Sequence, residues 1–412
     1  MFEKFLSWIF ILIIPALVSG PFLPDLFVSI LSLSFFWLAY KNNLWVWLKH
    51  PFVLLVIIFW IYTILRSLFS TNLFFSLESS LFYIRFLFFS LTIIFLLQKN
   101  EKLKYHFAVV LFLTVFIVSF DAYIQYFFGV NLIGIELSNP HRINGLFRDE
   151  YIIGSFISRL LPLLLYFITI YISFEKKLRI DIIFLIIFLF VAVLLSGERA
   201  AFFYAAATIF TLFFLNKKLR KTLSYVIFIS ISAIVLLLLT LPDLKQRMVN
   251  QTFNEFGFNS NSKNFAIFTP IHQDHYKSAY LMFLDNKIFG QGPKMFRIKC
   301  FEDQFNPQGC TNHPHNTYMQ LLAELGILGA IPVLLIFILI TFFLFSRFLN
   351  LYFLSNSKSF NNDETICLIV CFTISLWPFI PTGSFFNNWL NVIYYIPIGI
   401  YLSHLDYFKL KL

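Results

Sequence analysis

Long apolar runs separated by short polar breaks recur from one end of the chain to the other. A helix that crosses the hydrocarbon core of a bilayer takes about 20 mostly apolar residues. No small-residue cleavage pattern separates the first run from the second, so we interpret the first run as a helix and not as a signal peptide. The pattern predicts twelve transmembrane helices, at about 5–19, 24–40, 51–69, 77–97, 105–128, 151–173, 180–196, 200–215, 222–241, 328–349, 364–381 and 386–404.

The composition agrees with an all-α integral membrane protein. The chain of 412 residues is 59% apolar and 13% charged, whereas soluble domains are typically about 45–50% apolar and about 25% charged. A soluble enzyme is therefore excluded, and so is a soluble domain on a single anchor, because apolar runs occupy both halves of the chain. Glycine (14), proline (15) and cysteine (4) are too scarce for a collagen-like, disordered or disulfide-scaffold protein.

The basic residues of the short loops indicate the orientation of the helices. Lysine and arginine are retained on the cytoplasmic side, and alternate short loops separate into a basic set and a set that holds only Arg142, Arg148 and Arg199. Both termini are therefore predicted to be cytoplasmic. The net charge of +10 is mostly explained by this asymmetry, so we expect no nucleic-acid partner. The cytoplasmic set is Lys4, Lys41, Lys49, Lys99, Lys102, Lys104, Lys176, Lys177, Arg179, Lys217, Lys218, Arg220, Lys221, Arg347, Lys358, Lys409 and Lys411.

One long polar segment interrupts the pattern on the outer side, between the ninth and tenth predicted helices. We therefore divide the chain into helices one to nine (1–241), a large outer loop (242–314) and helices ten to twelve (315–412). Loops of this length are usually functional or disordered, and the Phe and Tyr content of this one favours partial folding against the membrane surface. Its basic residues are Lys245, Arg247, Lys263, Lys277, Lys287, Lys294, Arg297 and Lys299.

The four cysteines form two pairs with different interpretations. Cys300 and Cys310 lie in the outer loop, where an oxidising compartment permits a disulfide, although two free thiols are the alternative. Cys367 and Cys371 lie one helical turn apart in the eleventh predicted helix. We expect this second pair to be small apolar packing residues.

Three arginines, Arg66, Arg85 and Arg159, fall inside predicted transmembrane helices. An ionised side chain at the bilayer centre costs at least about 2.5 kcal/mol, so each needs a partner, a cavity or a path to the interface. We expect Arg66 to snorkel to the outer interface. For Arg85 and Arg159 two interpretations stay open: snorkelling, or lining an outward-facing anionic site, with Glu78 as a partner.

Three sequence elements follow one another in the second half of the chain. Residues 196–203 read SGERAAFF, residues 283–297 read FLDNKIFGQGPKMFR, and residues 311–329 read TNHPHNTYMQLLAELGILG. They resemble three motifs of the O-antigen ligase and polymerase superfamily: Ser-x-x-Arg, Phe-Gly-x-Gly-x-x-x-Phe and His-Asn followed by Gly-x-x-Gly. The resemblance covers about residues 190–345 and implies a GT-C-like membrane fold.

The last motif provides the candidate catalytic residue. Pro314 disfavours a helical conformation at His313, so we expect a helix to begin at His315 or Asn316 and the His315 ring to face a wet cleft. The resemblance implies a catalytic role for His315, whereas a cap or interfacial histidine is the alternative. We interpret Asn316 as a cap or orienting residue, His313 as a neighbour that shapes the turn, and Gly326 and Gly329 as close-packing positions in the membrane.

Arg199, on a short outer turn, is the second candidate. Its planar guanidinium suits a phosphate, whereas a bond to Glu198 or to a lipid phosphate is the alternative. The family often carries another arginine about eighteen residues before the first glycine of Phe-Gly-x-Gly, and His272 occupies that position here. The positive charge is then expected from one of His272, His275, Lys277, Arg247 and Arg297.

The resemblance implies a multi-pass enzyme of the bacterial inner membrane that acts in lipopolysaccharide biosynthesis. Such an enzyme transfers polysaccharide, at the periplasmic face, from undecaprenyl pyrophosphate to a sugar hydroxyl of lipid A-core. No Asp-x-Asp pair occurs, so we expect neither a metal ion nor another cofactor. An O-antigen polymerase and a protein-directed oligosaccharyltransferase remain alternatives. A transporter or flippase is disfavoured, because its two halves would contain matching broken helices.

Overall fold

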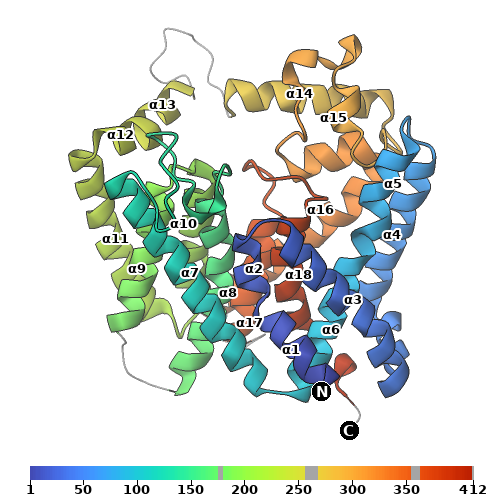
Figure 1. The fold of residues 1–412 in the computed structure, drawn as a ribbon, viewed down its shortest axis with the longest axis horizontal. Coiled ribbons are helices and arrows are strands. Elements are labelled where there is room, and N and C mark those ends of the chain that lie inside the picture. Colours follow the sequence, from blue (N-terminus) through green and yellow to red (C-terminus); the bar gives the residue numbers. More distant parts are fainter. Residues whose placement is uncertain (175–179, 256–267, 354–361, 411–412) are drawn as a thin grey trace.

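The computed structural model describes residues 1–174, 180–255, 268–353 and 362–410 (Figure 1). Within these residues the chain is all-helical, and its extended segments form one isolated bridge, between Val130 and Glu136. Six of the basic residues named above lie outside the described residues and are not placed. They are Lys176, Lys177, Arg179, Lys263, Lys358 and Lys411.

Every one of the twelve apolar runs coincides with helix. The first run is divided between α1 and α2, and the fourth between α5 and α6. The eleventh run was predicted to extend to 381, but its helix ends at Ser375. The helices are α1 (Phe2–Ile11), α2 (Ile13–Val18), α3 (Phe22–Asn42), α4 (Pro51–Leu68), α5 (Leu73–Leu81), α6 (Arg85–Lys99), α7 (Lys102–Phe128), α8 (Ile153–Phe174), α9 (Ile180–Leu195), α10 (Arg199–Leu215), α11 (Arg220–Thr240), α16 (Thr317–Tyr352), α17 (Asp363–Ser375) and α18 (Asn388–Leu402).

Seven helical stretches of the described residues are long and apolar enough to cross a membrane. They are α3, α4, the combined α5 and α6, α7, most of α8, α11 and α16, whereas α9 and α10 are apolar but shorter. Phe228 and Leu239 of α11, and Leu339 and Phe342 of α16, are exposed on the outside of the bundle. Exposed apolar side chains on this scale suit a hydrocarbon environment. The number of spans and their orientation stay predictions.

The core lies around α6 and α8, which are the most deeply buried of these helices. Helix α6 packs against α3 and α18, and α8 packs against α10 and α17. The two sides of the bundle therefore meet through the C-terminal helices. In Figure 1 the teal and green helices lie beside the red α17 and α18, with the blue helices on the other side.

The outer loop is folded where the structure describes it. It contains α12 (Pro242–Lys245), a π-helical turn (Gln246–Asn250), α13 (Gln251–Glu255), α14 (Pro270–Asp285) and α15 (Phe296–Lys299). These elements lie across one end of the bundle, opposite the N-terminus (Figure 1). A small second core joins α14 and α15 to α16 through Met282, Phe296 and Ala323. Cys300 and Cys310 form a disulfide beside this core, with Cα atoms 5.2 Å apart, whereas Cys367 and Cys371 are buried free thiols.

The glycine motifs mark a crossing of two chain segments. Gly326 has φ 63° and ψ −164°, which breaks α16, and residues 287–292 dock at the break. The amide of Gln291 donates to Ala323 O (2.9 Å) and that of Gly292 to Glu324 O (2.7 Å), while the amide of Ile327 donates to Lys287 O (2.9 Å). A Cβ at Gly290 or Gly326 would overlap the opposing backbone. The close packing expected at Gly326 is thus against the outer loop and not against a membrane helix.

Arg66 fastens this crossing to α4, so the prediction that it snorkels is wrong. Its Nε and Nη2 donate to Gly290 O at 3.0 and 2.6 Å, and the Tyr62 hydroxyl on the same helix donates to Leu325 O at 2.6 Å. The carbonyl groups left free by the helix break and the glycine turn thereby receive donors, as buried polar groups require.

Arg85 is held inside the helix bundle by a carboxylate. Its Nη2 lies 3.2 Å from Asp25 Oδ1 of α3. The partner proposed from the sequence, Glu78, instead pairs with Lys294, at 3.1 Å between Oε2 and Nζ. Arg85 is therefore a paired structural charge, and neither of its two expected roles is needed to explain it.

Candidate functional site at one end of the bundle

The start of α16 is fixed by Asn316, which is its N-cap. The Oδ1 atom accepts from the amides of Tyr318 (3.0 Å) and Met319 (3.1 Å), and Nδ2 donates to Pro378 O at 2.6 Å. Asn316 therefore joins the motif helix to the segment between α17 and α18, in agreement with its interpretation as a cap.

His315 precedes this cap in the left-handed backbone region, with φ 53°. Non-glycine residues rarely adopt this conformation, because Cβ crowds the backbone. The Thr382 amide donates to His315 O at 2.9 Å and holds the turn. The helix thus begins just after His315, and the histidine lies on a constrained turn in front of it.

Four histidines gather at this turn. The His315 ring centroid lies 4.1 Å from that of His313, 5.4 Å from that of His275 and 5.7 Å from that of His272. His272 and His275 come from one face of α14, whose N-cap is Thr269. The cluster therefore joins the outer loop to the start of the motif helix.

Hydrogen bonds fix two of these rings. His275 Nδ1 lies 2.9 Å from Gly309 O, next to the disulfide at Cys310. A carbonyl oxygen only accepts, so His275 Nδ1 carries a proton in this bond. His272 Nδ1 lies 2.6 Å from the Thr269 hydroxyl. The two α14 rings are therefore oriented before any ligand arrives.

Burial and mutual repulsion keep these rings neutral. Burial, followed by the neighbouring rings of His313, His272 and His275, lowers the pKa of His315 to about 3. Burial and the positive charge of Arg297 lower the pKa of His313 to about 4. Burial, His275 and Arg199 lower the pKa of His272. At neutral pH each of these three rings is a proton acceptor.

Arginines form a second cluster beside the histidines. Arg199 opens α10; its Nη2 lies 2.6 Å from Glu255 Oε2 and its Nη1 donates to the Thr252 hydroxyl at 3.3 Å. Arg247 donates from Nε to Gly197 O at 3.1 Å. Burial and the nearby charges of Arg199 and Arg142 lower the pKa of Arg247. Positive charge is therefore concentrated at this end of the bundle.

The carboxylate expected beside Arg199 is used elsewhere. Glu198 accepts from the amides of Gly154 (2.6 Å) and Ser155 (3.3 Å), at the start of α8. Burial raises the pKa of Glu198 to about 7, while the charge of Arg142 opposes this rise. Glu198 is therefore a capping group with a reduced negative charge, and Glu255 is the carboxylate that pairs with Arg199.

The other candidate residues from the sequence lie in different parts of the structure. Arg297 lies over the Phe75 ring at 5.8 Å, close enough to lower the pKa of His313. Lys277 is exposed on α14, away from the buried His275 and Tyr276. Arg159 is buried, 4% exposed, and bonded to protein hydroxyls. The structure brings the four histidines and Arg199, Arg247 and Arg297 to one end of the bundle. Lys277 lies on the exposed face of α14 at the same end, whereas Arg159 and Arg85 lie within the bundle.

Two residues of this region were missed in the sequence. Arg142 was counted only as a loop charge, and Thr382 as part of a break between two helices. The signal at Thr382 was the polar stretch 382–384 between two apolar runs. Its bond to His315 O joins residues too far apart in sequence for any local pattern to reveal.

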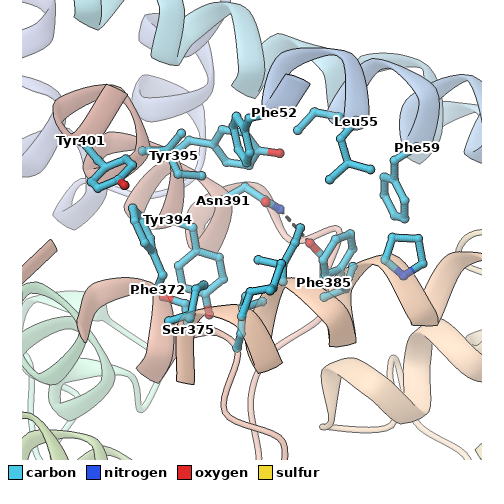
Figure 2. A pocket seen from close by; sticks show the side chains of 18 of the residues that line it. Phe52, Leu55, Phe59, Phe372, Ser375, Phe385, Asn391, Tyr394, Tyr395 and Tyr401 are labelled. Carbon is cyan, nitrogen blue, oxygen red and sulfur yellow. Dashed lines mark hydrogen bonds between the residues drawn. The ribbon is translucent and has the colours of Figure 1, made fainter. Parts of the chain in front are cut away.

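An apolar cleft of about 500 Å³ opens beside the start of α16 (Figure 2). It reaches from Thr317 and Ser384 to His50 and Leu405, and α4, α16, α17 and α18 form its walls. Figure 2 shows aromatic side chains of α4, α17 and α18 around it, Phe59, Phe372 and Tyr394 among them. The cleft therefore links the end of the bundle that holds the histidines to its apolar interior.

Comparison with known families supports the resemblance seen in the motifs. Residues 184–334 match the family model described as O-antigen ligase. This segment of the chain is thus similar to the O-antigen ligase family. No curated protein matched the chain. Similarity to this family over residues 184–334 suggests a glycosyltransferase-like enzyme with polysaccharide and lipid-linked substrates.

The O-antigen ligase segment holds Arg199, Arg247, the four histidines and the glycine crossing. Elements outside it complete the site: α4 supplies Arg66, and the segment after α17 supplies Thr382. Among the described residues, no group of three or more His, Cys, Asp or Glu side chains is arranged to hold a metal ion.

Proposed function

We propose that this protein transfers O-antigen or a related polysaccharide from undecaprenyl pyrophosphate to a sugar hydroxyl of lipid A-core, at the periplasmic face of the bacterial inner membrane. The observation that carries the proposal is the position of His315, a neutral ring in a histidine cluster next to a group of arginines. A base beside an anion site is what displacement of a pyrophosphate carrier requires.

In the proposed step the acceptor hydroxyl attacks the anomeric carbon of the carrier-linked sugar. A new C–O bond forms, the bond from the anomeric carbon to the phosphate oxygen breaks, and undecaprenyl pyrophosphate leaves with the electron pair. The hydroxyl proton passes to the His315 ring. General-base assistance contributes about 10²- to 10⁴-fold to such steps. A single in-line displacement inverts the anomeric centre.

The leaving group carries its charge without protonation, so it needs cations. Arg199 is the first, and we assign the second cation to Arg247, because it is charged and lies within electrostatic range of Arg199. His272, at the sequence position where the family often has arginine, is neutral at pH 7 and supplies hydrogen bonding instead. Removing one such contact costs about 10²- to 10³-fold in rate by analogy with oxyanion donors.

The low pKa of His315 also fits a site in which the ring becomes an effective base only after the pyrophosphate carrier has bound. A free ring with a pKa of about 3 is a weak base. A bound pyrophosphate places negative charge beside the ring and raises its pKa, because opposite charges favour the ionised form. The base is then strengthened by its own substrate. The apolar cleft, which opens next to Thr317, suits the hydrocarbon chain of the same carrier.

The direct test is reconstitution in liposomes with carrier-linked polysaccharide and lipid A-core as acceptor. We expect transfer by the wild-type protein, loss of transfer in His315→Ala, and no change with EDTA, since the proposed step needs no divalent cation. Transfer that stops with EDTA and returns with Mg²⁺ would overturn the metal-independent step.

Lipopolysaccharide gels from a deletion strain separate the alternatives. Loss of the whole ladder with accumulation of carrier-linked chains supports the ligase. A single repeat on the lipid A-core instead indicates a polymerase that joins carrier-linked repeats. An unchanged ladder rejects both functions.

A further inference from the structure

The strained turn at His315 is held from outside the family segment. The His315 carbonyl accepts from the Thr382 amide at 2.9 Å, and φ at His315 is 53°. A non-glycine residue is strained in this region, so contacts with its surroundings must hold it there. The direction of the His315 ring therefore depends on where Thr382 lies.

Thr382 is in turn held by a buried arginine. Arg159 Nη2 donates to the Thr382 hydroxyl at 3.0 Å, and its Nη1 donates to the Tyr394 hydroxyl at 2.8 Å. The guanidinium also lies over the Tyr204 ring at 4.8 Å. Arg159 is 4% exposed, so it is too deep to contact a substrate at the end of the bundle.

We propose that Arg159 is a positioning residue, which sets the backbone turn of His315 through Thr382. Arg159 reaches across from α8, and Tyr394, its second acceptor, is a residue of the apolar cleft wall. The chain of contacts from Tyr394 through Arg159 and Thr382 to His315 therefore joins the cleft to the base. This inference rests on the proposed function, in which His315 takes the acceptor proton.

The planar geometry of the Arg159 guanidinium is more important for this positioning than its charge. Two donors of one rigid group reach two hydroxyls, which the single ammonium of lysine cannot reproduce. Arg159→Lys therefore keeps the charge and breaks the geometry. Thr382→Val removes the hydroxyl at nearly equal volume and retains the amide that binds His315 O, whereas Thr382→Ser retains both groups.

Arg85 supplies the matched control. It is also an arginine of the helix bundle, but its partner is Asp25 of α3, and Arg85→Lys keeps a cation beside that carboxylate. Any general effect of an arginine-to-lysine change in the bundle appears in both variants, whereas an effect through Thr382 appears only in Arg159→Lys.

The test measures kcat and KM for the carrier-linked donor in liposomes. We expect Arg159→Lys and Thr382→Val to lower kcat on the order of 10- to 100-fold, as a displaced catalytic group does, with KM nearly unchanged. Thr382→Ser and Arg85→Lys should stay near wild type. In a His315→Ala background the Arg159 and Thr382 changes should have no further effect. A wild-type kcat in Arg159→Lys, or additive losses in the His315→Ala background, overturns the inference.

A second readout does not depend on activity. Diethyl pyrocarbonate acylates neutral imidazole, and mass spectrometry reports the rate at His315 separately from the neighbouring histidines. We expect this rate to change several-fold in Arg159→Lys and Thr382→Val, and to be unchanged in Arg85→Lys. If the wild-type protein transfers no sugar, the proposed function fails and this rate alone decides about Arg159. Equal rates in Thr382→Val and wild type overturn the inference.

Discussion

The interior of the bundle and the end that holds the histidines differ in how their charged side chains are partnered. Two arginines of the bundle are paired with carboxylates: Arg85 contacts Asp25, and the buried Arg347 lies 2.8 Å from Asp363. At the end that holds the histidines Glu255 pairs with Arg199 at 2.6 Å, but Arg199 and Arg142 together lower the pKa of Arg247, and three further histidine rings lie around His315. Ionisable groups with shifted pKa values are typical of functional sites, so the clustered basic residues are the better candidates for binding an anion.

The largest expected effect comes from the centre of the outer end. His315→Ala should lower the transfer rate by about 10²- to 10⁴-fold, because the acceptor hydroxyl loses its base. The rate is measured in liposomes after membrane levels have been matched. His106, an exposed histidine of α7, provides the control as His106→Ala. Near-wild-type transfer by His315→Ala would remove it from the mechanism.

The next largest losses of transfer rate are expected at two arginines. Arg199→Lys and Arg247→Lys should each lower transfer by about 10²- to 10³-fold, since lysine keeps the charge but not the paired hydrogen bonds that grip a phosphate. Arg85→Lys again serves as the bundle control. If Arg199→Lys transfers at the wild-type rate, bidentate phosphate binding at that residue is rejected.

Substitutions at glycines test how much the contact between residues 287–292 and α16 contributes to thermal stability. Gly326→Ala should lower the thermal unfolding midpoint, since it adds about 1–2 kcal/mol of left-handed strain to an overlap with the backbone of residues 287–292. Gly129 also has a positive φ, of 76°, but nothing lies within 4 Å of its Cβ position. Gly129→Ala therefore reports strain alone, and equal losses in the two variants would argue against the crossing.

The disulfide affects the outer end only. Closing a loop between Cys300 and Cys310 is worth about 2–3 kcal/mol in the chain-entropy model. Cys300→Ser with Cys310→Ser should therefore make residues 296–310 more sensitive to protease and leave the bundle helices protected. Cys371→Ser, in the buried free pair, is the comparison. Unchanged cleavage in the outer loop contradicts a stabilising role.

A further test concerns the pH dependence of stability. The folded-state pKa values of His313 and His315, about 4 and 3, lie below the ordinary value of 6.5. Between these values the unfolded chain binds more protons than the folded one, so stability is lost as pH falls below about 6.5 and the loss levels off near pH 3–4. Replacing both residues with Asn should flatten the fall in thermal midpoint between pH 7 and pH 5. A slope as steep as in the wild type rejects the assignment.

The sequence predicted the positions of the helices better than it predicted which side chains contact one another. Each apolar run became helix because apolar content and helix propensity act over neighbouring residues. The Ser-x-x-Arg and His-Asn motifs likewise pointed to Arg199, His315 and Asn316 as candidate site residues. The partner of Arg85 was predicted wrongly, and Arg66 was expected at the interface, because Asp25 and Gly290 are 60 and 224 positions away from them.

By itself, the sequence determined an all-helical chain with apolar runs of membrane-spanning length, a polar segment between 242 and 314, and the residue types of a candidate base and a candidate anion site. Only the tertiary structure decided which arginines are neutralised, where the two glycine motifs cross, and that Thr382 and Arg159 hold the turn at His315. The physical reason is that hydrogen bonds and ion pairs require distances of a few ångströms, and those distances are fixed by helix packing between segments remote in sequence.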